Sequence, residues 1–238
     1  IASPVFTGNV GIGVTPETWG TNGDFTGLQV GTGLSLYGRG AGDEDRVGMM
    51  GNAYHDATND RYEYIGTGHA THYAHSDGQH VFQVAPSGTA DAAISFTTAM
   101  AIDNAGRVTK PLQPSFMARG YASRPSGVVL FSSVPHNVGS HYNNSNGRFT
   151  APIAGNYLMT WFANAKSATN YMNWTLHING NEYGGAFSDA ATANYDTTGG
   201  AMVVSLAAGD YVIVFSATNY AAPATTTSYS FFSGYLLG

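Results

Sequence analysis

The chain has 238 residues, a net charge of −6, only 10% charged residues, 31 glycines and no cysteine. Phosphate recognition needs clustered positive charge, and disulfides and thiolate metal sites need cysteine, so this composition argues against nucleic-acid binding and excludes both cysteine-based features. No apolar run approaches the roughly 18 residues of a membrane span, so we expect no membrane insertion. The high glycine content, with few of the residues that build long helices, predicts an all-β protein of short strands and tight turns.

The N-terminal part begins with an alternation of glycine and β-branched residues over residues 8–14. A strand with this pattern carries Val and Ile on one face and almost no side chains on the other, which lets another backbone approach closely. Residues 28–30 and 34–37 repeat the alternation around a glycine-rich turn. Residues 104–108 resemble the segment that starts at Gly8, so we interpret the two as a weak repeat that opens and closes one module.

A linker is predicted at residues 110–114, where Pro111 and Pro114 stand three residues apart. Proline interrupts sheet pairing and restricts the preceding residue to extended conformations, so this segment favours a connection between domains. We therefore expect one domain over residues 1–110 and a second over residues 111–238.

The second domain has longer strand-like segments. They are residues 156–164, 172–178, 201–206, 211–215 and 229–237. Asn179-Gly180 and residues 208–210 are predicted to be hairpin turns, because Asn and Gly tolerate positive φ.

Two of these strands are apolar on both faces. In the first, Tyr157, Met159 and Trp161 share one face, while Leu158 and Phe162 share the other; residues 211–215 are apolar throughout. Only one face of a sandwich sheet can reach its core, so the other must be covered. A neighbouring subunit is the favoured cover, and a loop or the upstream segment is the alternative.

The C-terminal part resembles the globular head of the complement q subcomponent and its relatives in the complement and tumour-necrosis-factor superfamily. The motifs that carry this resemblance occur in the family's order over residues 112–238; they are PSFMA at 114–118, GRFTAPIAGNY at 147–157, LAAGDYV at 206–212 and FFSGYLL at 231–237. The resemblance implies a ten-strand jelly-roll sandwich that forms a tight homotrimer, with both termini at its base.

The N-terminal part is similar to the shaft of phage tail fibres, through ASPVFTG at residues 2–8 and NVGIG at residues 9–13. This resemblance implies a Gly-rich, intertwined β shaft or knob module. Because the first residue is Ile1 rather than Met, we expect a fragment with the rest of the fibre upstream.

Together the two resemblances predict a homotrimeric bacteriophage tail-fibre tip, an extracellular part of the virion that attaches to a host cell-surface receptor. Polysaccharide and protein both stay open as the receptor. The alternatives are a tail-spike glycan hydrolase and a purely structural appendage.

Histidines gather at His69, His72, His75 and His80. Axial metal sites in some trimeric fibres use His-x-His pairs, which a strand places on one face. The spacing here is i, i+3, which sends neighbours to opposite faces, so loop histidines without a metal are expected. We predict no cofactor and no metal ion, although an axial ion is left open.

The sequence contains no recognisable catalytic motif. Asp43, Glu44 and Asp45 fit a solvated loop, and Asp189 and Asp196 flank one loop without a nearby basic partner. A triad of Ser140, His141 and Asp210 is left open, but a chain with eight histidines commonly contains such combinations. We therefore predict that the protein is not an enzyme.

Three loops of the jelly roll are predicted to form its free tip, at about residues 165–170, 189–197 and 219–227. Tyrosine among Ser, Thr and Asn is typical of adaptable binding surfaces. The predicted receptor contacts are Lys166, Asn170, Asn194, Tyr195, Asp196 and Tyr220. Soluble loops without a ligand are the alternative.

Overall fold

The structure, a computed structural model, describes residues 6–20, 25–40, 42–121, 126–167, 171–189, 196–218, 220–221 and 229–238. The chain forms two compact units, Ile1–Pro111 and Leu112–Gly238. The described residues form strands and one 3-10 turn, η1 (Val138–Ser140), so the all-β prediction is confirmed. None of the described segments is a helix long and apolar enough to cross a membrane.

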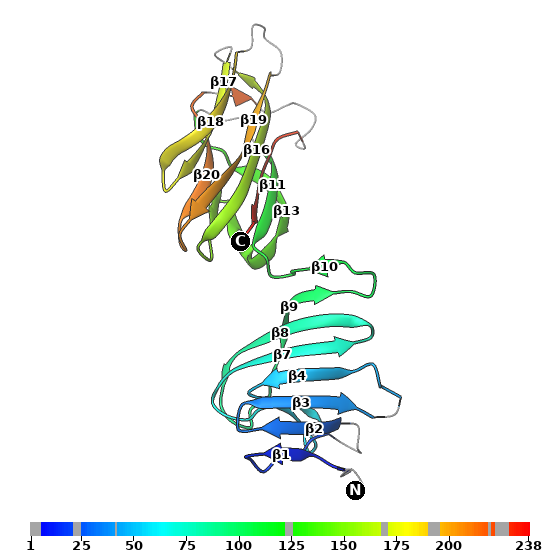
Figure 1. The fold of residues 1–238 in the computed structure, drawn as a ribbon. Helices are drawn as coiled ribbons and strands as arrows, with labels where there is room; N and C mark the ends of the chain where they lie inside the picture. Colours follow the sequence, from blue (N-terminus) through cyan, green and yellow to red (C-terminus); the bar gives the residue numbers. More distant parts are fainter. Residues whose placement is uncertain are drawn as a thin grey trace. The chain divides into compact units, whose positions relative to one another are not determined.

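The first unit is built on an eight-stranded sheet in the order β1-β2-β3-β4-β7-β8-β9-β10 (Figure 1). Its strands are β1 (Val10–Ile12), β2 (Phe25–Val30), β3 (Leu34–Arg39), β4 (Val47–Gly51), β7 (Gly68–Ser76), β8 (Gln79–Gly88), β9 (Thr97–Ile102) and β10 (Val108–Thr109). All neighbours pair antiparallel except β1 and β2. The two segments read as a repeat therefore supply the two edge strands of this sheet.

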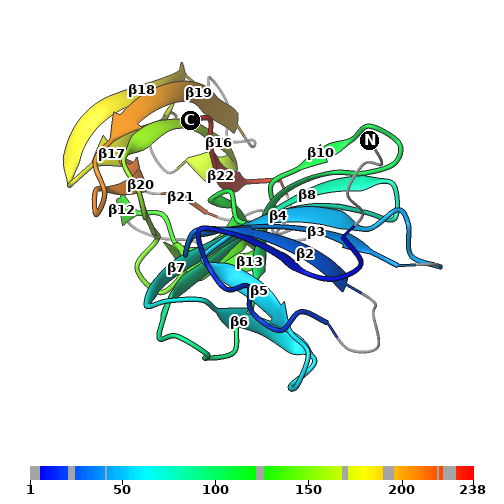
Figure 2. The same ribbon diagram turned by 60° about the horizontal axis from the view of Figure 1, so that its bottom comes forward.

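One face of this sheet forms a core with the hairpin of β5 (Ala53–Asp56) and β6 (Arg61–Tyr64), which lies beside it in Figure 2. Trp19, Phe25, Tyr37 and Met50 are buried there. Gly27 makes room for the indole, because a Cβ at that position would lie 2.6 Å from the Trp19 ring. The small residues of the sheet thus accommodate aromatic rings of the same chain.

The glycine-rich start of the chain also uses a glycine for close packing within the chain. A Cβ at Gly11 would collide with the carbonyl oxygen of Val14, so the close backbone approach that the sequence predicted is made within one chain. The description of residues 1–110 as an intertwined shaft or knob module stays a prediction.

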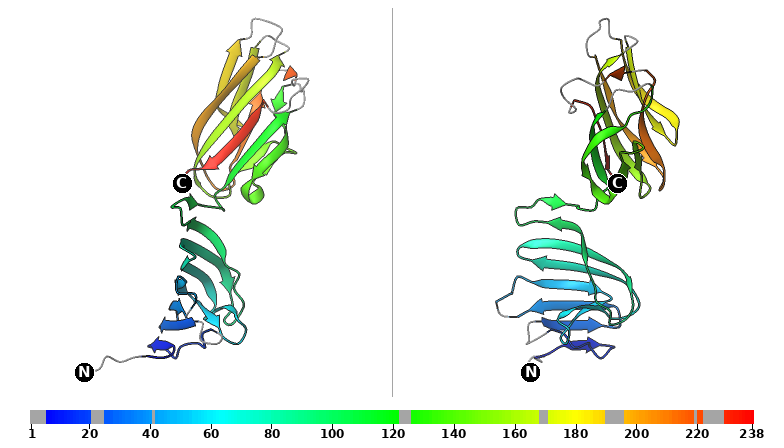
Figure 3. Two further views of the ribbon diagram at one scale, coloured as in Figure 1. Left: turned by 90° about the vertical axis from the view of Figure 1, so that its right-hand side faces the viewer. Right: turned by 180° about the vertical axis from the view of Figure 1, so that it is seen from behind.

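The second unit is a two-sheet sandwich whose strands are seen from two sides in Figure 3. The strands of the first sheet are β11 (Ser115–Tyr121), β13 (Phe131–Asn137), β16 (Gly155–Ser167), β19 (Asp196–Leu206), β21 (Tyr220–Ala221) and β22 (Phe231–Leu236). The strands of the second are β12 (Gly127–Val128), β14 (Tyr142–Asn143), β15 (Arg148–Thr150), β17 (Tyr171–Ile178), β18 (Asn181–Asp189) and β20 (Tyr211–Ser216). The first sheet runs in the order β13-β11-β22-β16-β19, and the second in the order β14-β15-β20-β17-β18.

Of the two predicted hairpin turns, one is confirmed. Asn179 and Gly180 have φ values of 53° and 84° and join the paired strands β17 and β18. The other prediction is wrong, because residues 208–210 connect β19 and β20, which lie in different sheets. Gly209 still adopts a φ of 90°, so the sequence identified the turn but not the strands that it joins.

The sandwich core lies between the two sheets and is rich in aromatic rings. Phe116 stacks on Tyr142 with ring centroids 4.8 Å apart and on Phe149 at 4.9 Å. Trp174 from the second sheet and Tyr157 from the first are fully buried. Burying rings of this size contributes about 2–3 kcal/mol each, so these residues drive the closure of the sandwich.

The two ends of the second unit lie beside each other. The backbone N–H of Leu236 donates to the carbonyl of Pro114 at 3.0 Å, and that of Asn156 donates to the carbonyl of Gly238 at 2.9 Å. These contacts fix one end of β16, so the other end, near Ser167, is the far end of this unit.

Candidate interaction site

The outward face of the first sheet of the sandwich carries exposed apolar side chains. We call this surface the head face; its apolar members are Met117, Leu158, Phe162, Val203, Phe231 and Tyr235. Val203 is 57% exposed, Tyr235 45% and Met117 38%. The prediction that Tyr157, Met159 and Trp161 face one side and Leu158 the other is confirmed, since the first three are buried and Leu158 is not.

The register of three strands arranges these side chains in rows. Leu158 on β16 stands directly between Tyr235 on β22 and Val203 on β19. Two rows away, Phe162 pairs with Phe231, and their rings stack at 6.0 Å. The sequence analysis identified Leu158 and Phe162 but missed their cross-strand partners, because strand pairing is not visible in the alternation of a single strand.

A shallow hollow lies between these rows. It is lined by Ser115, His136, Leu158, Thr160, Ser233 and Tyr235, among others. Its polar groups are paired with one another, with Ser115 Oγ 2.8 Å from His136 Nε2 and Thr160 Oγ1 2.6 Å from Ser233 Oγ. Because these groups already have partners, apolar contact is the main interaction that the head face offers.

The other two-faced strand is covered by its own unit. On the outward side of β20, the Arg148 guanidinium lies 4.0 Å from the centre of the Tyr211 ring, and His177 stacks on Phe215 at 4.8 Å. Ile213 between them is only 6% exposed. The neighbouring strands β15 and β17 therefore cover β20, rather than a loop or the upstream segment. Of the two strands that are apolar on both faces, β16 is the one whose outward face stays uncovered among the described residues.

Three of the predicted receptor contacts have a described backbone. Ser167 pairs with Tyr220, Lys166 with Ala221, and Ala165 with Asp196. The backbone of Lys166, Asp196 and Tyr220 thus lies at the far end of β16. The other three, Asn170, Asn194 and Tyr195, lie outside the described residues, and all six stay predictions.

The histidines lie on strands rather than loops, so that expectation is wrong. His69 and His75 are exposed and His72 is buried, as alternation along β7 requires, with Ala70 and Ala74 small enough to face the core beside His72. Burial lowers the pKa of His72, partly offset by its hydrogen bond to Gln83.

On the opposite face, the Tyr73 hydroxyl lies 2.8 Å from both His75 Nε2 and His80 Nδ1. Among the described residues, no group of three or more His, Asp or Glu side chains is arranged to hold a metal ion.

The acidic residues serve local structure. Asp43 pairs with Arg39 at 2.7 Å, while Glu44 and Asp45 are exposed in the loop. Asp210 accepts hydrogen bonds from Asn179 Nδ2 at 2.8 Å and from the Ala207 N–H at 2.7 Å, and these bonds lower its pKa. Its carboxylate therefore holds two turns together rather than orienting His141.

Comparison with known proteins gives a family match to the C1q domain over residues 116–237. Complement C1q tumor necrosis factor-related protein 3 of Mus musculus is 32% identical over 133 residues, which cover 55% of this chain and 53% of the relative. The Homo sapiens protein of the same name is 32% identical over 129 residues, 53% of this chain and 52% of the relative. The chain thus spans about half the length of the curated relatives it matches.

Solved structures with similarity include the globular domain of zebrafish complement 1qA protein, with a TM-score of 0.44 and 16% identity over 53% of this chain and 98% of that one. Murine APRIL at pH 8.0 has a TM-score of 0.44 and 12% identity over 52% of this chain and 99% of that one.

The interpretation as a bacteriophage tail-fibre tip in the virion, attaching to a host, is wrong. The curated relatives are complement C1q tumor necrosis factor-related proteins of mouse and human. The two misleading motifs are short. Most of ASPVFTG lies outside the described residues, and within NVGIG, Val10–Ile12 forms a three-residue edge strand. The motifs of the second unit are longer and ordered, and on their match the chain belongs to the C1q domain family.

Proposed function

We propose that the protein is a homotrimeric, non-enzymatic recognition protein in which the head face packs against two identical chains. The observation that carries this proposal is the uncovered head face, in which Tyr235, Leu158 and Val203 form one apolar row across three strands. Soluble monomers rarely leave a contiguous apolar surface of this kind exposed. Domains of this family typically form homotrimers, which supports the same arrangement.

Burial of the head face supplies a driving force for association. Each large apolar side chain moved from water into an interface contributes about 1.5–3 kcal/mol when fully buried, and somewhat less when already half-buried. Several such side chains are needed to offset the entropy lost when chains associate. The six apolar members of the head face, present in each of three chains, supply this contribution.

The ligand surface of this proposal is the far end of β16, where strand pairing brings the backbone of Lys166, Asp196 and Tyr220 to the same end of the sheet. A trimer presents this end three times, so sites that are weak singly bind a repetitive target with high avidity. The target is a receptor, either a polysaccharide or a protein. The trimer also carries residues 1–110 in three copies.

Single substitutions that introduce a charged side chain test the proposal. Leu158→Glu places a carboxylate at the centre of the head face, so light scattering should give one chain of 24.9 kDa in place of three. Asn144→Glu is the matched control, because Asn144 is exposed in the turn between β14 and β15, away from the head face, and should leave the mass unchanged. If Leu158→Glu folds and keeps the wild-type trimer mass, the head face is not the interface.

A further inference from the structure

The eight-stranded sheet of the first unit has a second, uncovered apolar face. The strand register places one residue of each strand in a continuous row, in which Leu28, Leu36, Met49, Tyr73, Phe82 and Met100 follow one another across β2, β3, β4, β7, β8 and β9. Leu36 is 38% exposed, Met49 47% and Phe82 36%. We call the surface around this row the module face.

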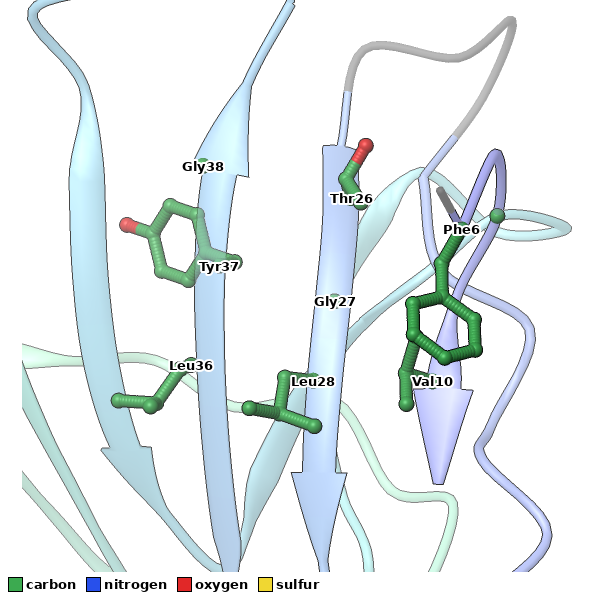
Figure 4. Close-up of a pocket in the computed structure, with 9 residues that line it drawn as sticks. Phe6, Val10, Thr26, Gly27, Leu28, Leu36, Tyr37 and Gly38 are labelled. Atoms are coloured by element: carbon green, nitrogen blue, oxygen red, sulfur yellow. The ribbon is translucent and has the colours of Figure 1, made fainter. Parts of the chain in front are cut away.

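The row continues beyond β2 to the edge of the sheet. Val10 on β1 pairs with Leu28, and Phe6 lies beside them over a hollow between β1, β2 and β3 (Figure 4). Flanking rows add Val30 with Leu34 on one side and Val47 on the other. The opposite face of the same sheet is the one that packs against the β5–β6 hairpin, so this face has no cover within its own unit among the described residues.

The module face carries no carboxylate, ammonium or guanidinium group. At the described outward positions of its strands there is no Lys, Arg, Asp or Glu, and the polar groups beside the apolar row include His75 and His80, which lie within hydrogen-bond distance of the Tyr73 hydroxyl. The charged residues of this unit stand in loops and toward the hairpin, as Asp43, Arg46 and Glu63 do. A partner rich in carboxylates or basic groups would find no Lys, Arg, Asp or Glu to pair with along the apolar row, so the row is complementary to another apolar face.

The size of the face decides between a free partner and a tethered one. Six steps between strands span about 29 Å and four residues along a strand about 13 Å, so the face covers roughly 400 Å². A free-standing complex buries about 800 Å² on each partner. The footprint of the module face is about half of that area, which favours a partner copy that is already held nearby, because a short tether gives an effective concentration on the order of millimolar.

The geometry points to the module faces of the three chains as a second interface of the trimer, packed against one another around its axis. This inference rests on the proposed homotrimer, which supplies the tether, since Pro111 of each unit is followed directly by Leu112 of the head. Closed three-fold symmetry lets all three identical faces turn toward one axis, so that each is covered by the other two.

Thiol labelling of the full chain tests this inference cleanly, because the chain has no cysteine of its own. Met49→Cys and Leu36→Cys place thiols on the module face, and Thr58→Cys places a matched thiol in the exposed turn of the β5–β6 hairpin. Each variant is first confirmed as a trimer by native mass. We expect a maleimide to react at least about tenfold more slowly at positions 49 and 36 than at position 58, because a packed interface excludes the reagent.

The outcomes separate the two proposals. Trimers in which all three positions react at equal rates overturn the module interface and leave the head trimer standing. A monomer mass for the wild-type chain overturns the proposed function, and with it the module interface. The tethered arrangement is supported if both cysteine variants label slowly and if adding Leu158→Glu to each of them makes labelling fast. In that case the head trimer is what holds the module faces together.

Discussion

The rings of Phe162 and Phe231 stack at 6.0 Å, with 19° between their planes, on the outward side of the head sheet. Each ring comes from a different strand, and β16 and β22 bring them together by direct pairing. A stacked aromatic pair that faces away from its own core is a natural anchor for a partner chain.

Phe162→Ala should therefore weaken the trimer more than the fold. Removing an aromatic anchor from an interface costs about 2 kcal/mol or more, so the trimer should dissociate at concentrations at least about tenfold higher than the wild type. Sedimentation equilibrium measures this shift. Ile153→Ala is the control, because Ile153 is similarly apolar and 51% exposed but is not part of the head face. Equal shifts for both variants would argue against an anchoring role.

Trp174→Ala should instead destabilise the sandwich itself. Trp174 is fully buried between the sheets, and its ring lies 6.3 Å from that of Phe131. Removing a buried aromatic ring costs about 3–5 kcal/mol through lost burial and the cavity left behind. Urea unfolding, followed by far-UV circular dichroism because its backbone signal does not depend on tryptophan fluorescence, measures the loss of unfolding free energy. A loss below about 1 kcal/mol would mean that the core between the sheets is not packed as described.

The sequence predicted features that depend on neighbouring residues in the chain, and it missed features that depend on residues far apart in the chain. Alternation within single strands identified the opposite faces of Tyr157 and Leu158, because the period of a strand is local. It could not show that Val203 and Tyr235 flank Leu158, since register is a long-range property. Local sequence also predicted the turn at Gly209. The prediction that this turn joins two paired strands was wrong, because β19 and β20, which follow one another in the chain, lie in different sheets.

The strands β16 and β20, which are apolar on both faces, show the same limit of sequence-based prediction. Both looked in need of a partner, but Arg148 and His177 cover the outward face of β20. Arg and His side chains have flat or long apolar parts that shield aromatic rings from water. The local sequence does not show which ring such a side chain will cover. The fibre interpretation failed for a related reason: short Gly-rich motifs specify a strand edge rather than a protein family.

The stability of the first unit should fall as the pH drops below about 6.5. Burial holds the pKa of His72 below its ordinary value, so the unfolded chain binds a proton in a pH range where the folded chain does not. Its stabilising contribution is therefore complete above about 6.5 and is lost as the pH falls toward the lowered pKa. The neighbours of the imidazole are Tyr37, Gln83, Tyr62 and Phe96, none of which offers a compensating negative charge.

Hydrogen exchange of β7 amides at about pH 7.5 and about pH 5.5, corrected for intrinsic rates, measures this effect. His72→Gln should flatten the pH dependence without removing it, because burial also lowers the pKa of His55. Protection that is the same at both pH values in the wild type would contradict the assignment.

The far end of β16 should carry ligand recognition. Lys166→Ala and Tyr220→Ala should each lower apparent affinity for a bound target on a printed glycan panel or a panel of immobilised cell-surface proteins by about tenfold or more, because three sites act together. The trimer mass should not change. Asn144→Ala, in an exposed turn elsewhere on the same unit, is the control. Undiminished binding by both variants would remove this end from the ligand surface.

The central claim is that three chains associate through the head face, and the native mass of the wild-type chain tests it most directly. Mass spectrometry under native conditions, over a dilution series that starts at micromolar concentration, should show a species of three times 24.9 kDa. That species should persist on dilution, because the head and module faces are buried together. A single chain of 24.9 kDa at micromolar concentration would contradict the account.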